Sequence, residues 1–198
     1  MTMIEQALPR HLHRIPSVAL DAALVVAGSL VVALFAQLSF RLPLTPVPVT
    51  GQTFAVLAIA TALGARRGAA AVGLYLVEGA AGLPFFAEGK AGFVWLLPSS
   101  LSGGYLWALV LAAFVVGWLA QRGWDRQLLT SIVAMALGQA IVLGLGTAWL
   151  AGALDVSPAA AASLGLYPFI PAEIIKLLVA AGLFPLLWRL YGRPPLRP

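Results

Sequence analysis

Residues 168–191, PFIPAEIIKLLVAAGLFPLLWRLY, form an apolar run that carries Glu173 and Lys176 near its start. A run of about 20 apolar residues is long enough for a helix that crosses a membrane. Charged side chains are costly at that depth, so an intramembrane carboxylate and ammonium indicate a functional role. At about 100° per residue, the two side chains lie on one face of the helix. They can therefore satisfy each other or bind a polar group between them.

The composition of the whole chain indicates an all-α integral membrane protein. Of its 198 residues, 61% are hydrophobic and 10% are charged, and the mean hydropathy is +0.96. Soluble domains carry about 25% charged residues. The apolar runs are long and do not alternate, which favours helices over a membrane β-barrel. The net charge of +5 comes mainly from arginines in the predicted loops, and it indicates membrane topology, not nucleic-acid binding.

The sequence predicts no metal site and no catalytic residues. It has no cysteines, and its two histidines, His11 and His13, lie in the polar N-terminal arm. These facts exclude a thiolate metal site, a cysteine nucleophile and a histidine-based metal centre within the membrane.

Six apolar runs predict six transmembrane helices in one substrate-binding domain, residues 18–191. A basic N-terminal arm, residues 1–17, precedes the domain, and a basic tail, residues 192–198, follows it. The first run is too long for the h-region of a signal peptide, so we expect an uncleaved span. The predicted helices cover residues 18–40, 53–63, 68–81, 103–120, 128–150 and 169–191.

Two of the predicted helices, 53–63 and 68–81, are too short to cross a membrane alone. At about 1.5 Å per residue they extend roughly 17–21 Å, whereas the hydrocarbon core is about 30 Å thick. We therefore expect partly re-entrant outer loops, because irregular backbone at that depth must be buried in protein or line a cavity. One is segment 41–52, which three prolines keep extended. The other is the apolar segment 79–92, which we expect to fold as a lid, whereas 152–166 is expected to be a plain loop.

The distribution of basic residues predicts that both termini face the cytoplasm. With the N-terminus inside, nine arginines fall on inside segments, only Arg41 and Lys90 fall on outside loops, and Lys176 lies within the membrane. Glu173 then lies in the outer half of the last helix, beside both outer loops. The inside residues are Arg10, Arg14, Arg66, Arg67, Arg122, Arg126, Arg189, Arg193 and Arg197.

Further polar side chains are predicted on this outer side. Thr50 and Gln52 end the proline-rich segment, and Tyr75 lies one turn before Glu78, which is a second candidate for a buried carboxylate. Polar groups beneath apolar, aromatic-bearing loops are typical of a pocket for a small, partly apolar solute.

Small residues recur at four-residue spacing in the first predicted helix, at Ala19, Ala23 and Ala27. Such a seam lets another helix approach closely in lipid. The partner can be another helix of this chain or a separate membrane protein, and the pattern alone leaves both open.

Four patches of the chain resemble the BioY family, the biotin-binding membrane subunits (S-components) of energy-coupling-factor (ECF) vitamin transporters. The patches are residues 45–53, TPVPVTGQT; residues 75–92, which contain GLPFFA; residues 100–105, SLSGGY; and residues 168–176, PFIPAEIIK. The resemblance covers about residues 18–191. The chain departs from the family pattern at Glu173, where aspartate after glycine is usual, and at Leu101, where proline is usual.

The resemblance implies high-affinity biotin capture in the bacterial cytoplasmic membrane by a multi-pass protein that is no enzyme and holds no cofactor. Its partners would be a coupling transmembrane subunit, docked on the alanine seam, and ATPase subunits, which alone use ATP, with membrane lipids around it. Glu173 would accept from the ureido N–H groups, and Lys176 would donate to the ureido carbonyl or balance a carboxylate. The other implied substrate-binding residues are Glu78, Tyr75, Thr50, Gln52, Phe85, Phe86 and Tyr105, with Trp95 over the rings.

Two other interpretations remain from the residues themselves. A proton-coupled secondary transporter of a vitamin-like solute would titrate Glu78 or Glu173, but it normally shows inverted repeats, and none is evident. An intramembrane enzyme would need a spaced Ser/His or paired-Asp arrangement, which the sequence lacks. If the last helix holds the ligand, Lys176→Ala is expected to weaken binding far more than Lys90→Ala.

Overall fold

The computed structural model describes residues 3–4 and 17–191, so the predicted N-terminal arm lies almost entirely, and the tail entirely, outside the described residues. The regular elements of the described chain are helices apart from one two-stranded hairpin, which confirms the predicted all-α class. In chain order the elements are α2 (Ser17–Gln37), β1 (Ser39–Phe40), β2 (Val49–Thr50), α3 (Gln52–Leu63), α4 (Ala65–Ala80), η2 (Ala87–Gly89), η3 (Phe93–Leu96), α5 (Gly103–Gln121), α6 (Leu128–Leu154), α7 (Pro158–Gly165) and α8 (Ile170–Tyr191).

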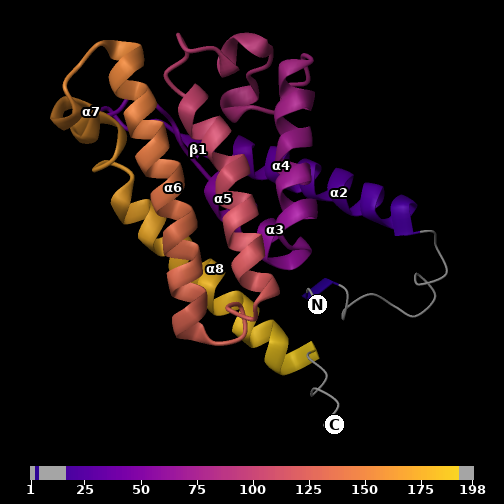
Figure 1. Ribbon diagram of the computed structural model, residues 1–198. Coiled ribbons are helices and arrows are strands. Elements are labelled where there is room, and N and C mark those ends of the chain that lie inside the picture. The colour runs from indigo at the N-terminus through magenta and orange to yellow at the C-terminus, as the bar shows by residue number, and fades with distance from the viewer. Residues whose placement is uncertain (1–2, 5–16, 192–198) are drawn as a thin grey trace.

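Four helices of the described chain, α2, α5, α6 and α8, are long and apolar enough to cross a membrane. Helices α3 and α4 have 12 and 16 residues and are shorter. Figure 1 shows α4, α5 and α6 side by side, with α8 crossing them at a slant and α2 extending away from the bundle. The core lies between α3, α4, α5 and α6, where Val56, Val72 and Val116 are almost completely buried.

The first helix ends at Gln37, three residues before the predicted end, because the chain turns into a hairpin. Strands β1 and β2 pair antiparallel, with Ser39 opposite Thr50 and Phe40 opposite Val49. The prolines between the strands prevent a helix and favour this extended path. The hairpin therefore brings Thr50 to the start of α3.

The turn between α3 and α4 is tighter than the sequence indicates. Gly64 alone links the helices, with φ of 83°, a conformation that glycine adopts readily. Arg66 and Arg67 therefore lie in the first turn of α4 and not between two helices, so the predicted start of this helix at residue 68 is wrong. Helix α5 contacts this turn through Gly117, where an added Cβ would lie 2.5 Å from the carbonyl carbon of Gly64.

The predicted plain loop at 152–166 is also wrong. Helix α6 continues to Leu154, and residues Pro158–Gly165 form α7. Ser157 caps α7 because its hydroxyl accepts from the backbone N–H of Ala160 at 3.3 Å, and Pro158 follows in the first helical position. Both start signals, a serine at the cap position and a proline after it, are present in the sequence.

The segment between α4 and α5, residues 81–102, is folded, as expected for a lid. It contains the short turns η2 and η3, and two tryptophans hold its C-terminal part. The indole N–H of Trp107 donates to the carbonyl of Leu96 at 3.1 Å, and that of Trp149 donates to the carbonyl of Ser100 at 2.9 Å. The following Gly103-Gly104 pair permits this contact, since an added Cβ on Gly104 would lie 2.1 Å from the Cβ of Trp149.

Gln37, at the end of α2, fastens the middle of the same loop. Its side-chain N–H groups lie 3.1–3.3 Å from the carbonyl oxygens of Pro84, Phe85 and Phe86, and its amide oxygen accepts from the backbone N–H of Gly89 at 3.0 Å. The loop is thus tied to three helices.

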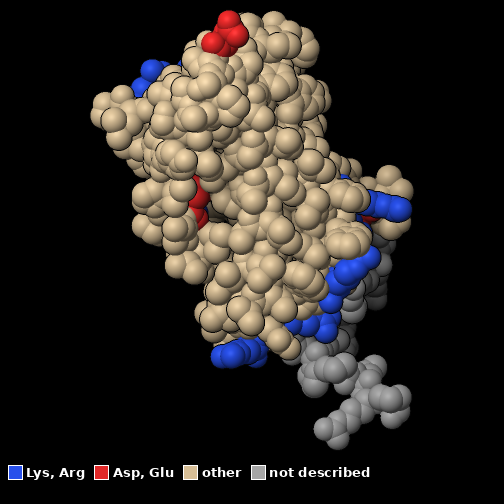
Figure 2. Space-filling model, turned by 60° about the vertical axis from the view of Figure 1, so that its left-hand side comes forward, with Lys and Arg blue, Asp and Glu red and all other residues tan. Residues whose placement is uncertain are grey.

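Charged side chains gather at the ends of the bundle. Arg66 and Arg67 begin α4, Arg122 and Arg126 lie in the turn between α5 and α6, and Arg189 lies in the last turn of α8. These positions share one end of the molecule (Figure 1). Figure 2 shows an otherwise mostly uncharged surface, with a hollow in which acidic atoms are visible.

Candidate functional site

A pocket with an empty volume of about 670 Å³, part of it open to solvent, lies at the end of the bundle opposite the arginines of α4, α8 and the α5–α6 turn. Its walls come from the hairpin, the loop between α4 and α5, and helices α3, α5, α6 and α8. Most of the lining is apolar, with polar side chains concentrated on the hairpin, the start of α3 and α8.

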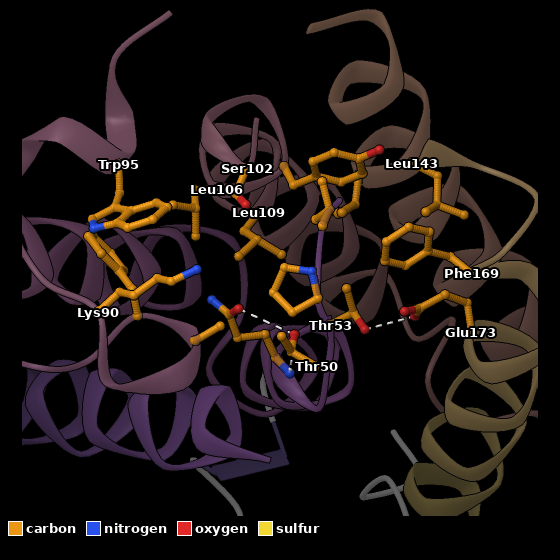
Figure 3. A pocket seen from close by; sticks show the side chains of 17 residues that line it. Thr50, Thr53, Lys90, Trp95, Ser102, Leu106, Leu109, Leu143, Phe169 and Glu173 are labelled. Atoms are coloured by element: carbon orange, nitrogen blue, oxygen red, sulfur yellow. Dashed lines mark hydrogen bonds between the residues drawn. The ribbon is translucent and has the colours of Figure 1, made fainter. Parts of the chain in front are cut away.

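Glu173 supplies the buried carboxylate of the pocket. It lies in the first turn of α8 and is 4% exposed. One carboxylate oxygen, Oε1, pairs with the ammonium of Lys176, and the other, Oε2, accepts from the hydroxyl of Thr53 at 2.8 Å. Figure 3 shows the Thr53–Glu173 bond at one side of the pocket, close to Phe169. The two charged residues thus pair with each other, and Glu173 also lines the pocket.

Lys176 lies behind Glu173 and is not part of the pocket lining. Its ammonium also donates to the backbone carbonyl of Thr50 at 2.7 Å and to the hydroxyl of Thr53 at 2.8 Å. These bonds join α8 to the hairpin and to α3, although the partners are more than 120 residues apart in the chain.

A second polar group is built around Gln52, the first residue of α3. Its amide N–H donates to the hydroxyl of Tyr75 at 2.7 Å, and its amide oxygen accepts from the hydroxyl of Thr50 at 3.3 Å. Tyr75 is completely buried behind Gln52 and does not line the pocket. Its ring packs edge-on against Phe86, with centroids 5.7 Å apart.

Aromatic rings form the walls of the pocket. Tyr105 and Phe169 are stacked with centroids 5.9 Å apart, and the hydroxyl of Tyr105 donates to the carbonyl of Gly165 at 2.6 Å. On the side opposite Glu173, the ammonium of Lys90 lies 4.3 Å from the ring centre of Trp95 (Figure 3). The pocket therefore has an anionic side and a cationic side with rings between them.

An ion-pair cluster lies on the loop at the cationic side. Glu88 pairs with Arg41 and, at 2.8 Å, with Lys90. The hydrogen bonds from Arg41 and Lys90 lower the pKa of the Glu88 carboxyl from 4.5 to about 2. Glu88 also has a positive φ of 63°, which is uncommon for a residue with a side chain. This cluster ties the hairpin to the loop above the pocket.

The predicted substrate-binding residues fall into three groups in the structure. Thr50, Gln52, Phe86, Trp95, Tyr105 and Glu173 line the pocket. Tyr75 and Lys176 contact these residues from behind. Glu78 and Phe85 are partly buried and do not line the pocket, so their contact with a ligand stays a prediction without support from the geometry.

Sequence reasoning missed several lining residues. Thr53 and Lys90 supply polar groups, and Ser102 adds a hydroxyl to the lining. Thr53 belongs to the same patch, TPVPVTGQT, as Thr50 and Gln52, and that was the signal available for it. The remaining lining residues are apolar and carried no local signal: Val47, Pro48, Ala87, Leu106, Leu109, Val142, Leu143 and Phe169.

The predicted alanine seam lies on the open side of α2. Ala19, Ala23 and Ala27 are all exposed, whereas Gly28 beside them is buried against Ala71 of α4. The seam therefore does not pack against the described residues of this chain.

The groups that line the pocket suit the binding of a small, partly apolar ligand. No group of three or more potential metal ligands occurs in residues 3–4 and 17–191. The Glu173 carboxylate is an acceptor for N–H donors, and the rings and aliphatic side chains fit an apolar body.

Comparisons with known proteins identify relatives of this chain. The profile of the BioY family matches residues 8–193. "Biotin transporter BioY" of Thermotoga maritima is 36% identical over 159 residues, which cover 80% of this chain and 90% of that protein. "Biotin transporter BioY2" of Lactococcus lactis is 34% identical over 154 residues, which cover 77% of this chain and 81% of that protein.

A solved structure shares the fold. The S-component for biotin from an ECF-type ABC transporter superposes with a TM-score of 0.78, covering 90% of this chain and 100% of that chain, at 20% sequence identity. The fold, the family profile and the close relatives agree, and the chain belongs to the BioY family.

Proposed function

We propose that this protein captures biotin and takes part in its uptake as the substrate-binding subunit of an ECF-type transporter. The observation that carries the proposal is the buried carboxylate of Glu173, held by Thr53 and Lys176 at one side of a pocket lined with aromatic rings. The names of its relatives, and the fold that it shares with the S-component, support the same ligand.

Biotin suits the chemistry of this pocket. Its ureido ring offers two N–H donors, and the carboxylate of Glu173 can accept hydrogen bonds from them. Its fused rings fit between Tyr105 and Phe169 on one side and Trp95 on the other. Its carboxylate then points toward Lys90, whose ammonium lines the cationic side.

We further propose six membrane crossings in the bacterial cytoplasmic membrane, with both termini in the cytoplasm. Helices α3 and α4 extend only about 18 and 24 Å at 1.5 Å per residue, so the hairpin and the loop 81–102 would complete their crossings as partly re-entrant segments. The arginines at the ends of α4, α5 and α8 support this orientation.

The partners would be a coupling transmembrane subunit and ATPase subunits. The exposed seam of Ala19, Ala23 and Ala27 supports helix docking on α2, since small residues permit close approach in lipid. The protein would bind biotin alone and would need these partners for energised uptake.

Equilibrium binding of labelled biotin to the purified full-length chain tests the proposal. Saturable binding at submicromolar biotin is expected, and Glu173→Gln should abolish most of it because an amide presents an N–H group to the ureido donors. The absence of saturable binding to the wild-type protein at submicromolar biotin would contradict the proposal.

A further inference from the structure

We propose that the turn between α5 and α6, residues 122–127, binds the phosphate of an anionic phospholipid from the surrounding membrane. The donors are the guanidinium groups of Arg122 and Arg126, each of which lies over a tryptophan ring, and the acyl chains lie along the exposed face of α5. The inference goes beyond the proposed biotin uptake and rests only on the insertion of this chain in a membrane.

Two aromatic rings hold the two guanidinium groups. The Cζ atom of Arg122 lies 3.3 Å from the ring centre of Trp118, and that of Arg126 lies 4.7 Å from the ring centre of Trp188. Both arginines are exposed. A guanidinium that stacks on a ring keeps the N–H groups in its plane for a phosphate.

Most of these N–H groups have no partner in the part of the chain that the structure describes. Arg122 donates to the carbonyl of Trp118 at 3.3 Å, and the side chain of Arg126 donates no hydrogen bond to a described residue. A guanidinium has five N–H donors, so both arginines can still bind an anion.

The turn itself positions Arg126. Gly123 has a φ of 87°, and an added Cβ there would lie 3.5 Å from Nε of Arg126, so that side chain lies against bare backbone. Trp188 is held in place because its indole N–H donates to Oδ2 of Asp125 at 2.6 Å. Asp125 is only 4% exposed. The turn therefore presents two cations at its surface and keeps its one carboxylate buried.

An exposed apolar stripe on α5 leads to this turn. Its members are Trp107, Leu111, Phe114 and Trp118, each 42–47% exposed. Their spacing of four, three and four residues places them on one helical face, and Arg122 continues the series after four more residues. Tryptophan and arginine at the cytoplasmic end of a membrane helix lie at the level of the headgroups. The stripe favours a phospholipid, because a soluble anion would use the charges and leave the apolar face without a contact.

Arg66 provides a matched control for a general effect of positive charge. It is an exposed arginine in the first turn of α4, at the same end of the bundle (Figure 1), and its side chain contacts no aromatic ring of the described residues. A general attraction between the protein and anionic lipid acts on Arg66 as it does on the turn. A bidentate phosphate site instead needs a planar guanidinium in a fixed place.

The test titrates the purified full-length protein in detergent with phosphatidylglycerol or with phosphatidylcholine of identical acyl chains, and native mass spectrometry measures the bound lipid. Arg122→Gln/Arg126→Gln removes both guanidinium groups, whereas Arg122→Lys/Arg126→Lys keeps the charges without the planar groups. Trp118→Leu removes the ring beneath Arg122 and keeps every charge. Size-exclusion profiles and thermal unfolding establish that each variant is folded.

We expect the wild type to prefer phosphatidylglycerol, and the glutamine double variant to bind it about 10- to 30-fold more weakly, as for two lost arginines near an anionic surface. The lysine double variant should lose most of the preference although its net charge is unchanged. Trp118→Leu should bind about threefold more weakly, because the guanidinium of Arg122 is no longer held. Arg66→Gln should bind as the wild type does.

Three results would overturn the proposal. The first is a wild-type protein without a preference for phosphatidylglycerol. The second is wild-type affinity in the lysine double variant, or an equal loss in Arg66→Gln, since either would show a general effect of charge. The third is displacement of the lipid by inorganic phosphate at the same concentration, which would show an anion site without acyl-chain contacts. A wild type that binds no biotin would contradict the proposed function and would leave the lipid result unaffected.

Discussion

The side chain of Gln37 offers a direct test of how the loop over the pocket controls ligand release. Gln37→Leu keeps the size of the side chain and removes its contacts with the carbonyls of residues 84–86 and with the N–H of Gly89. An amide has two N–H donors and one oxygen, so about three of these contacts count as full hydrogen bonds. At a net 0.5–1.5 kcal/mol each, these hydrogen bonds contribute about 1.5–4.5 kcal/mol to closure of the loop.

The lower part of that range applies because Gln37 is exposed to solvent. A loss of about 1.5–2 kcal/mol corresponds to loop opening that is roughly 10- to 30-fold more favourable. If biotin leaves when the loop opens, its dissociation should accelerate by the same factor. Gln37→Glu should have a larger effect, because a carboxylate facing three carbonyl oxygens is repelled and cannot donate.

The assay is a chase of labelled biotin from the purified protein with excess unlabelled biotin. Gln127→Leu, an exposed glutamine at the start of α6 and far from the loop, serves as the matched control. A change in the dissociation rate of less than twofold in Gln37→Leu, with a folded protein, would refute the reasoning.

Three further predictions concern the loop, the pocket wall and the docking face. The lowered pKa of Glu88 means that its ion pairs stabilise the loop fully above pH 4.5 and are lost as the pH falls toward about 2. Biotin release from the wild type should therefore accelerate only below about pH 4.5, whereas Glu88→Gln should release biotin quickly at every pH. A wild-type release rate that does not change with pH would contradict this prediction. Gly79→Ala should weaken biotin binding about tenfold or more, because its Cβ would lie 2.4 Å from a ring carbon of Phe86 and would displace that ring from the pocket wall. Unchanged affinity in a binding titration would contradict a role of the Phe86 ring in binding. Ala23→Leu should leave biotin binding by the isolated protein unchanged but should abolish copurification with the coupling subunit. Copurification at the wild-type level would contradict docking on the alanine seam.

The class of the fold could be predicted from the sequence because long apolar runs leave few alternatives in a membrane. Boundaries were less predictable where one residue decided them. Gly64 is the single residue between α3 and α4, and Ser157 with Pro158 starts a helix where a loop was expected. Both signals are local, and both were outweighed by the stronger hydropathy pattern.

The site was partly predictable for a similar reason. The pairing of Glu173 with Lys176 follows from their spacing on one helix, but the contacts of Lys176 with Thr50 and Thr53 join segments that only the tertiary fold brings together. The same is true of Lys90, which the sequence predicts to matter far less than Lys176 for binding but which lines the pocket.

The contact between Glu173 and Lys176 also has an electrical consequence. Moving one elementary charge through a membrane potential of 100 mV involves about 2.3 kcal/mol of work. The carboxylate and the ammonium lie one helical turn apart and touch, so together they respond to the field as a short dipole with no net charge. Any displacement of α8 along the membrane normal therefore moves no net charge of this pair. A voltage dependence of that step would report other charges, namely Arg189 at the end of α8, the carboxylate of the ligand or the charges of the loop.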